Sequence, residues 1–504
     1  MFLMGLDAGT SGVKAVVFDE YGKEQVKFYE SYPYIRSTPG YMEIEPDCFA
    51  GSVYKVIANA VHECGRKDIK TVAITTFGEA FLAVDRNGIA LTNIILATDI
   101  RGEKEIKWLE DKIGTDRLTD KTGLTPSHTY SAAKILWIKD NMCEIFTRTW
   151  KFMLIQDYLH FMLTGETVID YSAASRSMCF NVMDMNWDNE ILEELGLSRE
   201  QLSTPVISGH EVGTIKNNIA EELGLDNTTK VIVGGHDQPC CALGAGCLGS
   251  KDIANSCGTT ECLTPVLEEV LSTKDILQYS FPLEPFIIKG QYSTMAYNHT
   301  AGLALSWFVD NVYYNGVAGN RTKAFLDLEK RCLDIFNNVM VLPHFSGAAT
   351  PHMDSESKAA FIGISLDTGI EDLYLSLVES LVFEMNINLQ NLKTCGILPN
   401  RLITFGGGTK SELWMRLKAS ILDIELVIPE CEEVGALGAA IVSAESCGLY
   451  SSYEESIQNM VRYKRAITPD NELNERYKAK FRIYLELFNT LKSMNHQITS
   501  IRRI

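Results

Sequence analysis

Short apolar runs that stop at glycine and polar residues recur along the chain. Residues 2–6 and 13–19 flank a glycine-containing turn, which predicts a strand–turn–strand hairpin. Further runs at 70–75, 231–233 and 401–405 predict buried strands, because β-branched and other apolar residues are concentrated in them. Helical patterns separate several of these runs, so we expect an α/β fold.

Apolar residues spaced three and four positions apart predict the helices. The longest is expected at residues 370–394, as a core helix rather than a partner surface, with one face made of Leu373, Leu377, Leu381, Met385 and Leu389. Others are expected at 49–64, 409–422 and 432–447. Residues 102–164 are mostly helical in pattern and resemble an insertion that builds one wall of a cleft.

The segment from residue 231 to 246, VIVGGHDQPCCALGAG, joins a predicted strand to a predicted helix. Asp237 follows the strand and precedes Pro239, which favours a helix start. Ligands of open α/β sheets bind at the carboxyl ends of the strands, and a carboxylate there can accept a proton from a bound hydroxyl. Asp237 is therefore a candidate general base. The alternative is that it only caps the helix.

Two glycine–hydroxyl turns lie about 250 residues apart. Ala8 to Gly12 offers backbone N–H groups, Thr10 and Ser11, with Lys14 close behind, as a phosphate site requires. Asp7 stands where it can bind Mg²⁺ directly or through water. An ordinary tight hairpin is the alternative. The second turn, at residues 256–260, suggests two related halves that each hold phosphate, and three glycines at 406–408 would let a planar ligand approach the backbone.

Glu79 also follows a predicted strand, within Phe77-Gly78-Glu79. A carboxylate at that edge can accept hydrogen bonds from sugar hydroxyls, and a solvated loop glutamate is the equally weighted alternative.

Composition narrows the classes of partner. A chain of 504 residues exceeds one compact core, so two large domains are expected. The net charge of −19 argues against nucleic-acid or anionic-membrane partners, and no apolar run approaches a membrane span. Thirteen scattered cysteines without a CxxC pair favour a reducing cytoplasm. His236 with Cys240 and Cys241 lacks a further ligand pair at zinc spacing, so a metal cluster there is disfavoured.

Four motifs in order resemble those of the FGGY carbohydrate kinases, within the actin-like and hexokinase-like ATPase superfamily. They are GLDAGTSGVKAVVFD (5–19), GGHDQ (234–238), SCGTTECL (256–263), and FGGGTKSELWMRLKASIL (405–422) with EVGALGAAIVSA (433–444). The resemblance implies two actin-like (ribonuclease H-like) domains, each with a mixed five-stranded sheet flanked by helices, and an active site in the interdomain cleft. We expect an N-terminal domain at 1–246, a C-terminal domain at 247–450, and a helical tail at 451–504 that packs on the body.

The resemblance also implies roles for individual residues. Asp237 would be the general base on the sugar hydroxyl and, with Asp7, would help hold Mg²⁺. The sugar-binding candidates are Glu79, Gln238, Gly78 and, more weakly, Asp99. The residues expected to bind ATP are Thr10, Ser11, Lys14, Gly258, Thr259, Gly407, Gly408 and, less certainly, Ser411. A homodimer is expected by resemblance only.

The substrate stays open at this level. Xylulokinase-like members tend to carry Met-His-Gly near residues 77–79, and glycerol kinase-like members carry Arg-Glu, whereas this chain has Phe-Gly-Glu. We expect that Gly78 leaves room for a larger substrate, and we favour a ketose, above all a pentulose such as xylulose or ribulose. A polyol such as glycerol or erythritol is the second choice. An actin-like ATPase that binds no sugar is a remote third.

Overall fold

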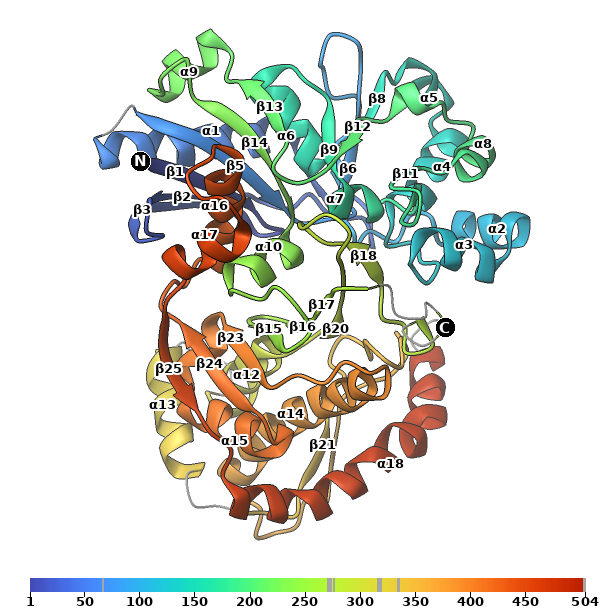
Figure 1. Ribbon diagram of the computed structural model, residues 1–504. Coiled ribbons are helices and arrows are strands. Elements are labelled where there is room, and N and C mark those ends of the chain that lie inside the picture. Colours follow the sequence, from blue (N-terminus) through green and yellow to red (C-terminus); the bar gives the residue numbers. More distant parts are fainter. Residues whose placement is uncertain (66–67, 270–273, 275–276, 315–319, 333–335, 502–504) are drawn as a thin grey trace.

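The computed structural model describes the chain except residues 66–67, 270–273, 275–276, 315–319, 333–335 and 502–504. Two mixed sheets form its two halves, an upper half from the N-terminal part of the chain and a lower half from the C-terminal part (Figure 1). The α/β two-domain fold expected from the sequence is confirmed.

The first sheet has six strands. Their order across the sheet is β13 (Glu211–Thr214), β14 (Lys230–His236), β5 (Ile69–Thr76), β1 (Phe2–Ala8), β2 (Gly12–Asp19) and β3 (Glu24–Ser31). Strands β14, β5 and β1 are mutually parallel, and the others pair antiparallel. The predicted hairpin is therefore β1–β2, with the glycine turn at residues 9–11.

The second sheet repeats this arrangement. Its order is β25 (Tyr463–Ile467), β24 (Glu425–Pro429), β23 (Arg401–Phe405), β15 (Asp252–Cys257), β16 (Glu261–Thr264) and β20 (Ala296–Asn298). Parallel and antiparallel pairs follow in the same succession as in the first sheet. Each sheet thus has six strands rather than the expected five, because the short antiparallel strands β13 and β25 extend one edge of each.

Helices cover both sheets. In the N-terminal half they are α1 (Pro46–Cys64), α2 (Glu103–Ile113), α3 (Thr115–Thr122), α4 (Ser131–Asn141), α5 (Cys143–Arg148), α6 (Ile155–Thr164), α7 (Tyr171–Ser175), α8 (Asn189–Leu195), α9 (Asn217–Leu223) and α10 (Asp237–Gly244). Later in the chain they are α12 (Gly302–Phe308), α13 (Arg321–Cys332), α14 (Ile370–Thr394), α15 (Glu412–Leu422), α16 (Val434–Ser446), α17 (Tyr453–Met460) and α18 (Asn471–Ile501).

Smaller sheets complete the architecture. One has the order β4 (Glu43–Ile44), β7 (Ile94–Ile95), β6 (Phe81–Val84) and β8 (Lys151–Leu154), and another has β17 (Val266–Leu267), β19 (Tyr292–Thr294) and β18 (Leu283–Pro285). The two-stranded pairs are β9 (Val168–Asp170) with β12 (Thr204–Val206), β10 (Phe180–Asn181) with β11 (Asn186–Trp187), and β21 (Met340–Leu342) with β22 (Ala360–Ile362).

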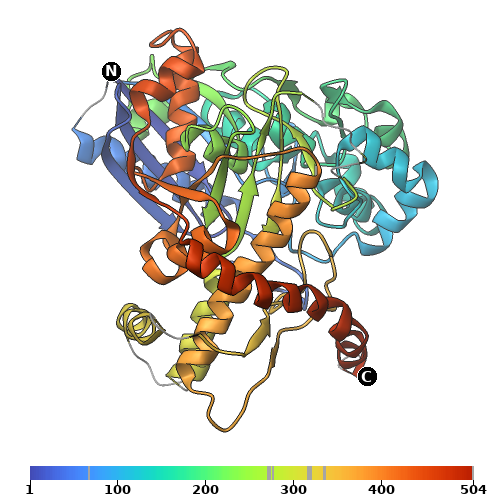
Figure 2. The same cartoon turned by 60° about the horizontal axis from the view of Figure 1, so that its bottom comes forward.

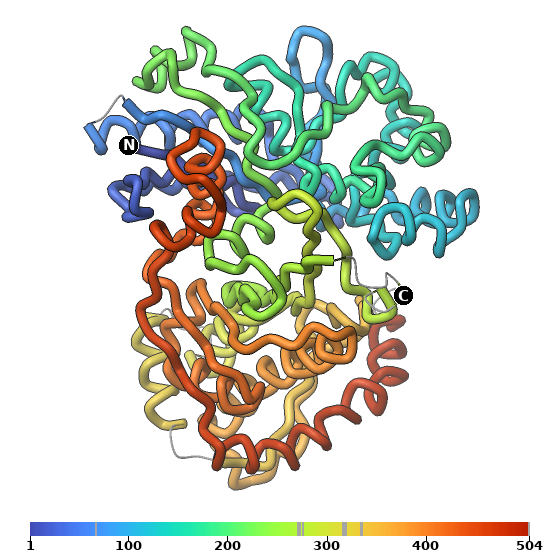
Figure 3. The backbone as a smooth tube through the Cα atoms, in the orientation of Figure 1, coloured from blue at the N-terminus to red at the C-terminus, as the bar shows by residue number. Residues whose placement is uncertain are grey.

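Helix α16 lies on the N-terminal sheet although it comes late in the chain (Figure 3). It packs against β1 and crosses α10 at glycines on both helices. A Cβ atom at Gly5 of β1 would lie 2.1 Å from the carbonyl oxygen of Ala436, so only glycine fits there. One core cluster consequently joins residues from Leu3 to Val461.

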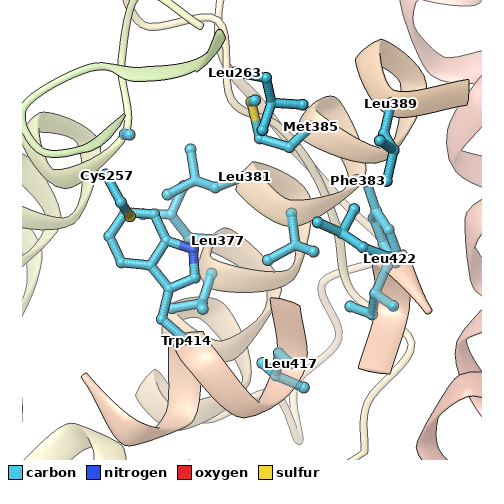
Figure 4. Packing of buried hydrophobic residues seen from close by; sticks show 14 of the residues in the cluster. Cys257, Leu263, Leu377, Leu381, Phe383, Met385, Leu389, Trp414, Leu417 and Leu422 are labelled. Carbon is cyan, nitrogen blue, oxygen red and sulfur yellow. The ribbon is translucent and has the colours of Figure 1, made fainter. Parts of the chain in front are cut away.

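The C-terminal half has its core between α14 and α15. Leu377 and Leu381 of α14 face Trp414 of α15, whose ring lies beside Cys257 at the end of β15, and Met385 lies beside Leu263 (Figure 4). The tail contains β25 as well as two helices, and α18 runs across the lower half (Figure 2). The long predicted helix at 370–394 is α14.

Candidate active site

Asp237 is the first residue of α10, immediately after β14 ends at His236. The N-cap position belongs to His236, and no side chain caps the helix there, so the capping alternative does not describe Asp237. Its side chain keeps 29% of its surface exposed. Burial raises the pKa of Asp237 above its usual range, and the neighbouring carboxylates add to this, while His236 opposes it.

His236 links Asp237 to a glutamate of the C-terminal half. Its Nε2 lies 3.1 Å from Asp237 Oδ1, and its Nδ1 lies 3.1 Å from Glu284 Oε2 on β18. Glu284 is fully buried. Burial alone would lower the pKa of His236, but Glu284 and Asp237 raise it to about 9, so the imidazole is a cation at neutral pH.

Glu79 is held by Arg176, which lies 97 residues later in the chain. Nε of Arg176 donates to Glu79 Oε1 at 2.8 Å, and both side chains are largely buried. The solvated-loop alternative therefore does not apply. Although burial favours the neutral acid, the Arg176 cation holds the pKa of Glu79 below its usual range. Glu79 also has φ of 63°, a strained value for a residue with a side chain, and strain of this kind is typical of functional sites.

The expectation that Gly78 leaves room for a larger substrate is wrong. A Cβ atom there would lie 2.7 Å from Cγ of Arg176 and 3.2 Å from Cδ2 of His236. The missing side chain makes room for Arg176, not for a larger substrate.

Asp99 is likewise a structural residue, which corrects its expected role as a sugar contact. It is fully buried. Oδ1 accepts hydrogen bonds from Nε and the backbone N–H of Arg101, and Oδ2 accepts from Nη2 of Arg101 and the backbone N–H of Met42. These four bonds occupy both carboxylate oxygens.

Gln238 connects α10 to the second hairpin. Its Oε1 accepts a hydrogen bond of 3.3 Å from the hydroxyl of Thr264 on β16. The strand that follows the second glycine turn therefore contacts the residue next to Asp237.

The first glycine turn lies beside Asp7 and Lys14, which face each other across the β1–β2 ladder. Thr10 and Ser11 are exposed at the tip of the turn. Burial raises the pKa of Asp7 to about 6, with Lys14 opposing the shift and Asp237 adding to it. Since Asp237 affects Asp7 electrostatically, the two carboxylates belong to one site. Lys14 extends to Glu433, at 2.8 Å.

The second turn and the glycine triplet meet at Cys257. Gly258 follows that residue, and Thr259 is exposed on the turn. A Cβ at Gly408 would lie 2.4 Å from the Cys257 sulfur, so the two segments are in close contact. Gly407 has open space beside it and lines a cavity of about 500 Å³.

That cavity has the size of a small-molecule pocket, and its lining is mostly polar and charged. Residues that sequence reasoning did not single out complete it, namely Thr409, Lys410, Glu412, Ile428, Lys464 and Arg465, together with Lys14 and Gly407. The hydroxyl oxygen of Ser411 accepts the N–H of Trp414 and caps α15, so its expected adenosine contact stays a prediction.

Within the described residues, no group of three or more His, Cys, Asp and Glu is arranged to hold a metal ion. Asp7 and Asp237 nevertheless fit Mg²⁺, because this ion is usually bound by one or two carboxylates together with substrate phosphates and water. Burial is the main cause of the raised pKa of Asp7, and the nearby carboxylate of Asp237 adds to it, so a bound cation would favour the ionised form of both groups.

Sequence reasoning missed Arg176 and Glu284. A signal for each was available, because both are single charges inside runs of small or apolar residues, at 171–180 and 281–288. A charge in such a run is buried only when it is paired. The sequence does not reveal which partners they meet.

Each half presents a hydroxyl-bearing glycine turn, and the structure adds the coupled carboxylates of Asp7 and Asp237 and a cavity of about 500 Å³, features expected of a phosphotransferase. A family model described as the FGGY family of carbohydrate kinases, N-terminal domain, matches residues 2–244, and its C-terminal counterpart matches residues 253–447. The chain belongs to the FGGY family of carbohydrate kinases. It is therefore an enzyme that phosphorylates an alcohol group, and the resemblance found in its motifs is confirmed.

Relatives of known name cover the whole chain. The xylulose kinase of Bacillus subtilis is 26% identical, over 100% of this chain and 99% of its own. Among solved structures, a gluconate kinase from Lactobacillus acidophilus has a TM-score of 0.90 at 22% identity, and a xylulose kinase from the same organism has 0.89 at 22%, each covering 99% of both chains. At this identity the structures show the fold alone. In the described part of the chain, no helix has the length and apolar character of a membrane span.

Proposed function

We propose that the protein transfers the γ-phosphoryl group of Mg-ATP to a hydroxyl of a small, uncharged ketose, a pentulose such as xylulose or ribulose. The observation that carries this is the position of Asp237, which is partly exposed, contacts His236 and influences the charge of Asp7. A carboxylate so placed can orient and deprotonate a sugar hydroxyl. The name of the Bacillus subtilis relative supports the choice of sugar.

The net charge of the side chains around Glu79 and Asp237 favours an uncharged substrate. Glu79, Glu284 and Asp237 are acidic, and Arg176 and His236 are cationic, so the five groups sum to one negative charge. A sugar acid would bring a second negative charge to this surface. We therefore place the substrate among ketoses rather than aldonates such as gluconate.

Each part of the site has a role in the transfer. Gln238 and Glu79 would hold sugar hydroxyls, while Thr10, Ser11, Gly258 and Thr259 would hold the phosphates. Mg²⁺, where bound by Asp7 and Asp237, would neutralise phosphate charge. Phosphoryl transfer depends on such positioning and neutralisation more than on covalent chemistry. The cavity lined by Gly407 would take the adenosine.

A polyol kinase is the second candidate. Arg176 supplies a guanidinium beside Glu79, as the Arg-Glu pair of glycerol kinase-like members does, although it comes from a different part of the chain. Glycerol or erythritol could use that pair.

A coupled ADP-release assay tests the proposal. It would compare xylulose, ribulose, hexuloses, glycerol, erythritol and gluconate, with the wild type beside Asp237→Asn. We expect turnover with one pentulose and its loss in the variant. Turnover with gluconate alone, or full activity in Asp237→Asn, would refute the proposal. A rate of ATP hydrolysis that is the same with and without each sugar would favour an ATPase that binds no sugar.

A further inference from the structure

Three tyrosines donate hydrogen bonds to three successive carbonyl groups of the first glycine turn. The hydroxyl of Tyr32 donates to the carbonyl of Gly9, that of Tyr34 to Thr10 at 3.0 Å, and that of Tyr29 to Ser11 at 3.2 Å. All three come from β3 and the residues just after it. We call them the tyrosine brace.

The brace fixes where the turn's N–H groups point. In a trans peptide the carbonyl oxygen and the following N–H lie on opposite sides of the bond. Each tyrosine that holds a carbonyl therefore turns the next N–H away from itself, namely those of Thr10, Ser11 and Gly12. Among the described residues, the N–H groups of Thr10 and Ser11 have no hydrogen-bond partner.

Two of the three rings contact neighbouring groups, although those of Tyr29 and Tyr34 are exposed. Tyr32 is buried against Phe49, with ring centroids 5.4 Å apart. The ring of Tyr29 lies over Gly12, where a Cβ atom would approach it to 2.6 Å. Donors held this way act on an anion without having to reorganise when it binds.

We propose that Tyr29, Tyr32 and Tyr34 are positioning residues that aim the turn's amides at the γ-phosphate of the nucleotide. The inference rests on the proposed function, because it assumes that this turn receives the transferred group. It requires that loss of the hydroxyls weaken binding of a triphosphate more than binding of a diphosphate.

Tyr→Phe variants test this, because phenylalanine keeps the ring and removes only the donor. Calorimetry would measure affinity for the Mg complexes of β,γ-imido-ATP and of ADP in each single variant and in the triple variant. We expect each hydroxyl to contribute about threefold to imido-ATP affinity, and the triple variant to lose about 30-fold, with ADP affinity unchanged. The kcat of sugar phosphorylation should fall in parallel. Tyr21→Phe, at the other end of the β2–β3 hairpin, is the matched control.

Equal losses for ADP and imido-ATP would overturn the proposal, because they would show general damage to the site. Unchanged imido-ATP affinity in the triple variant would overturn it as well. A wild type that binds imido-ATP, shows the selective loss in the variants and phosphorylates none of the sugars would refute the proposed substrate and leave the brace standing.

Discussion

Arg176 holds the carboxylate of Glu79 across 97 residues of sequence, with its Nε 2.8 Å from Oε1 and its guanidinium centre 5.3 Å from the centre of the Tyr130 ring. The same guanidinium lies 3.9 Å from Glu284. One buried cation therefore connects Glu79 of the N-terminal half to a strand of the C-terminal half.

Replacing Arg176 by lysine should impair sugar binding selectively. Lysine keeps the charge but loses the planar fork that holds Glu79 and stacks on Tyr130. We expect kcat/KM for the sugar to fall at least about tenfold, with KM for Mg-ATP unchanged. A fall of this size corresponds to the loss of one to two hydrogen bonds to a charged group. Steady-state kinetics with each substrate varied would measure this. Arg117→Lys, exposed on α3, is the control, and an equal rise in both KM values would contradict the assignment.

Gly78→Ala should produce the same defect by displacing Arg176. The added methyl group would lie 2.7 Å from Cγ of Arg176, so the side chain or the backbone must shift. We expect the sugar kcat/KM to fall and the melting temperature to drop. Gly51→Ala in α1 has open space around it and should be neutral or slightly stabilising. If Gly78→Ala instead accepted smaller sugars with normal efficiency, the space beside Gly78 would belong to the substrate after all.

Asp7→Asn should stabilise the nucleotide-free protein above pH 6. The pKa of Asp7 rises from 3.8 to about 6 on folding, so ionising it costs stability as pH increases through this range. The variant and the wild type should be equally stable below pH 4 and should differ by about 1 to 2 kcal/mol above pH 6 in favour of the variant, after allowance for solvent screening. Urea unfolding at several pH values measures the difference, with Asp111→Asn as the control. A variant that is less stable at pH 7 would show that Asp7 is a stabilising charge.

Glu284→Gln should destabilise the protein and change its response to pH. His236 has a pKa raised from 6.5 to about 9, so its contribution to stability is present below pH 6.5 and is lost as pH rises through 9. Without Glu284 the pKa of His236 falls, so the protein loses less stability as the pH rises from 6.5 to 9. At pH 7 we expect about 3 kcal/mol of destabilisation, because two buried cations lose a partner. Ser293→Ala removes only a hydroxyl donor to Glu284 and should cost about 1 kcal/mol. Identical pH profiles for Glu284→Gln and the wild type would contradict this.

Several of the main elements followed from local patterns, whereas the strands β3, β13, β20 and β24 were not predicted. The hairpin β1–β2, the strand that ends at His236 and helix α14 are each set by apolar periodicity and by glycines at their ends. The edge strand β25 was missed, because the alternating pattern of YKRAI was included in a tail expected to be helical.

The site was predictable only where adjacent residues act together. Asp237 and the glycine turns stand at the ends of their own strands, so sequence spacing locates them. Arg176, Glu284 and the tyrosine brace act through contacts between distant segments, which no spacing rule describes. Asp99 was misassigned because the sequence does not show that Arg101, two residues away, and the backbone N–H of the distant Met42 occupy its carboxylate in the folded loop.

Helix α16 determines when the N-terminal sheet can complete its packing during synthesis of the chain. Strand β1 is synthesised before the helix that covers it, and that helix is complete only at Ser446. Gly5 and Ala436 are in contact in the finished molecule but are made 431 residues apart. Part of the apolar surface of the N-terminal half therefore stays uncovered until α16 has been synthesised.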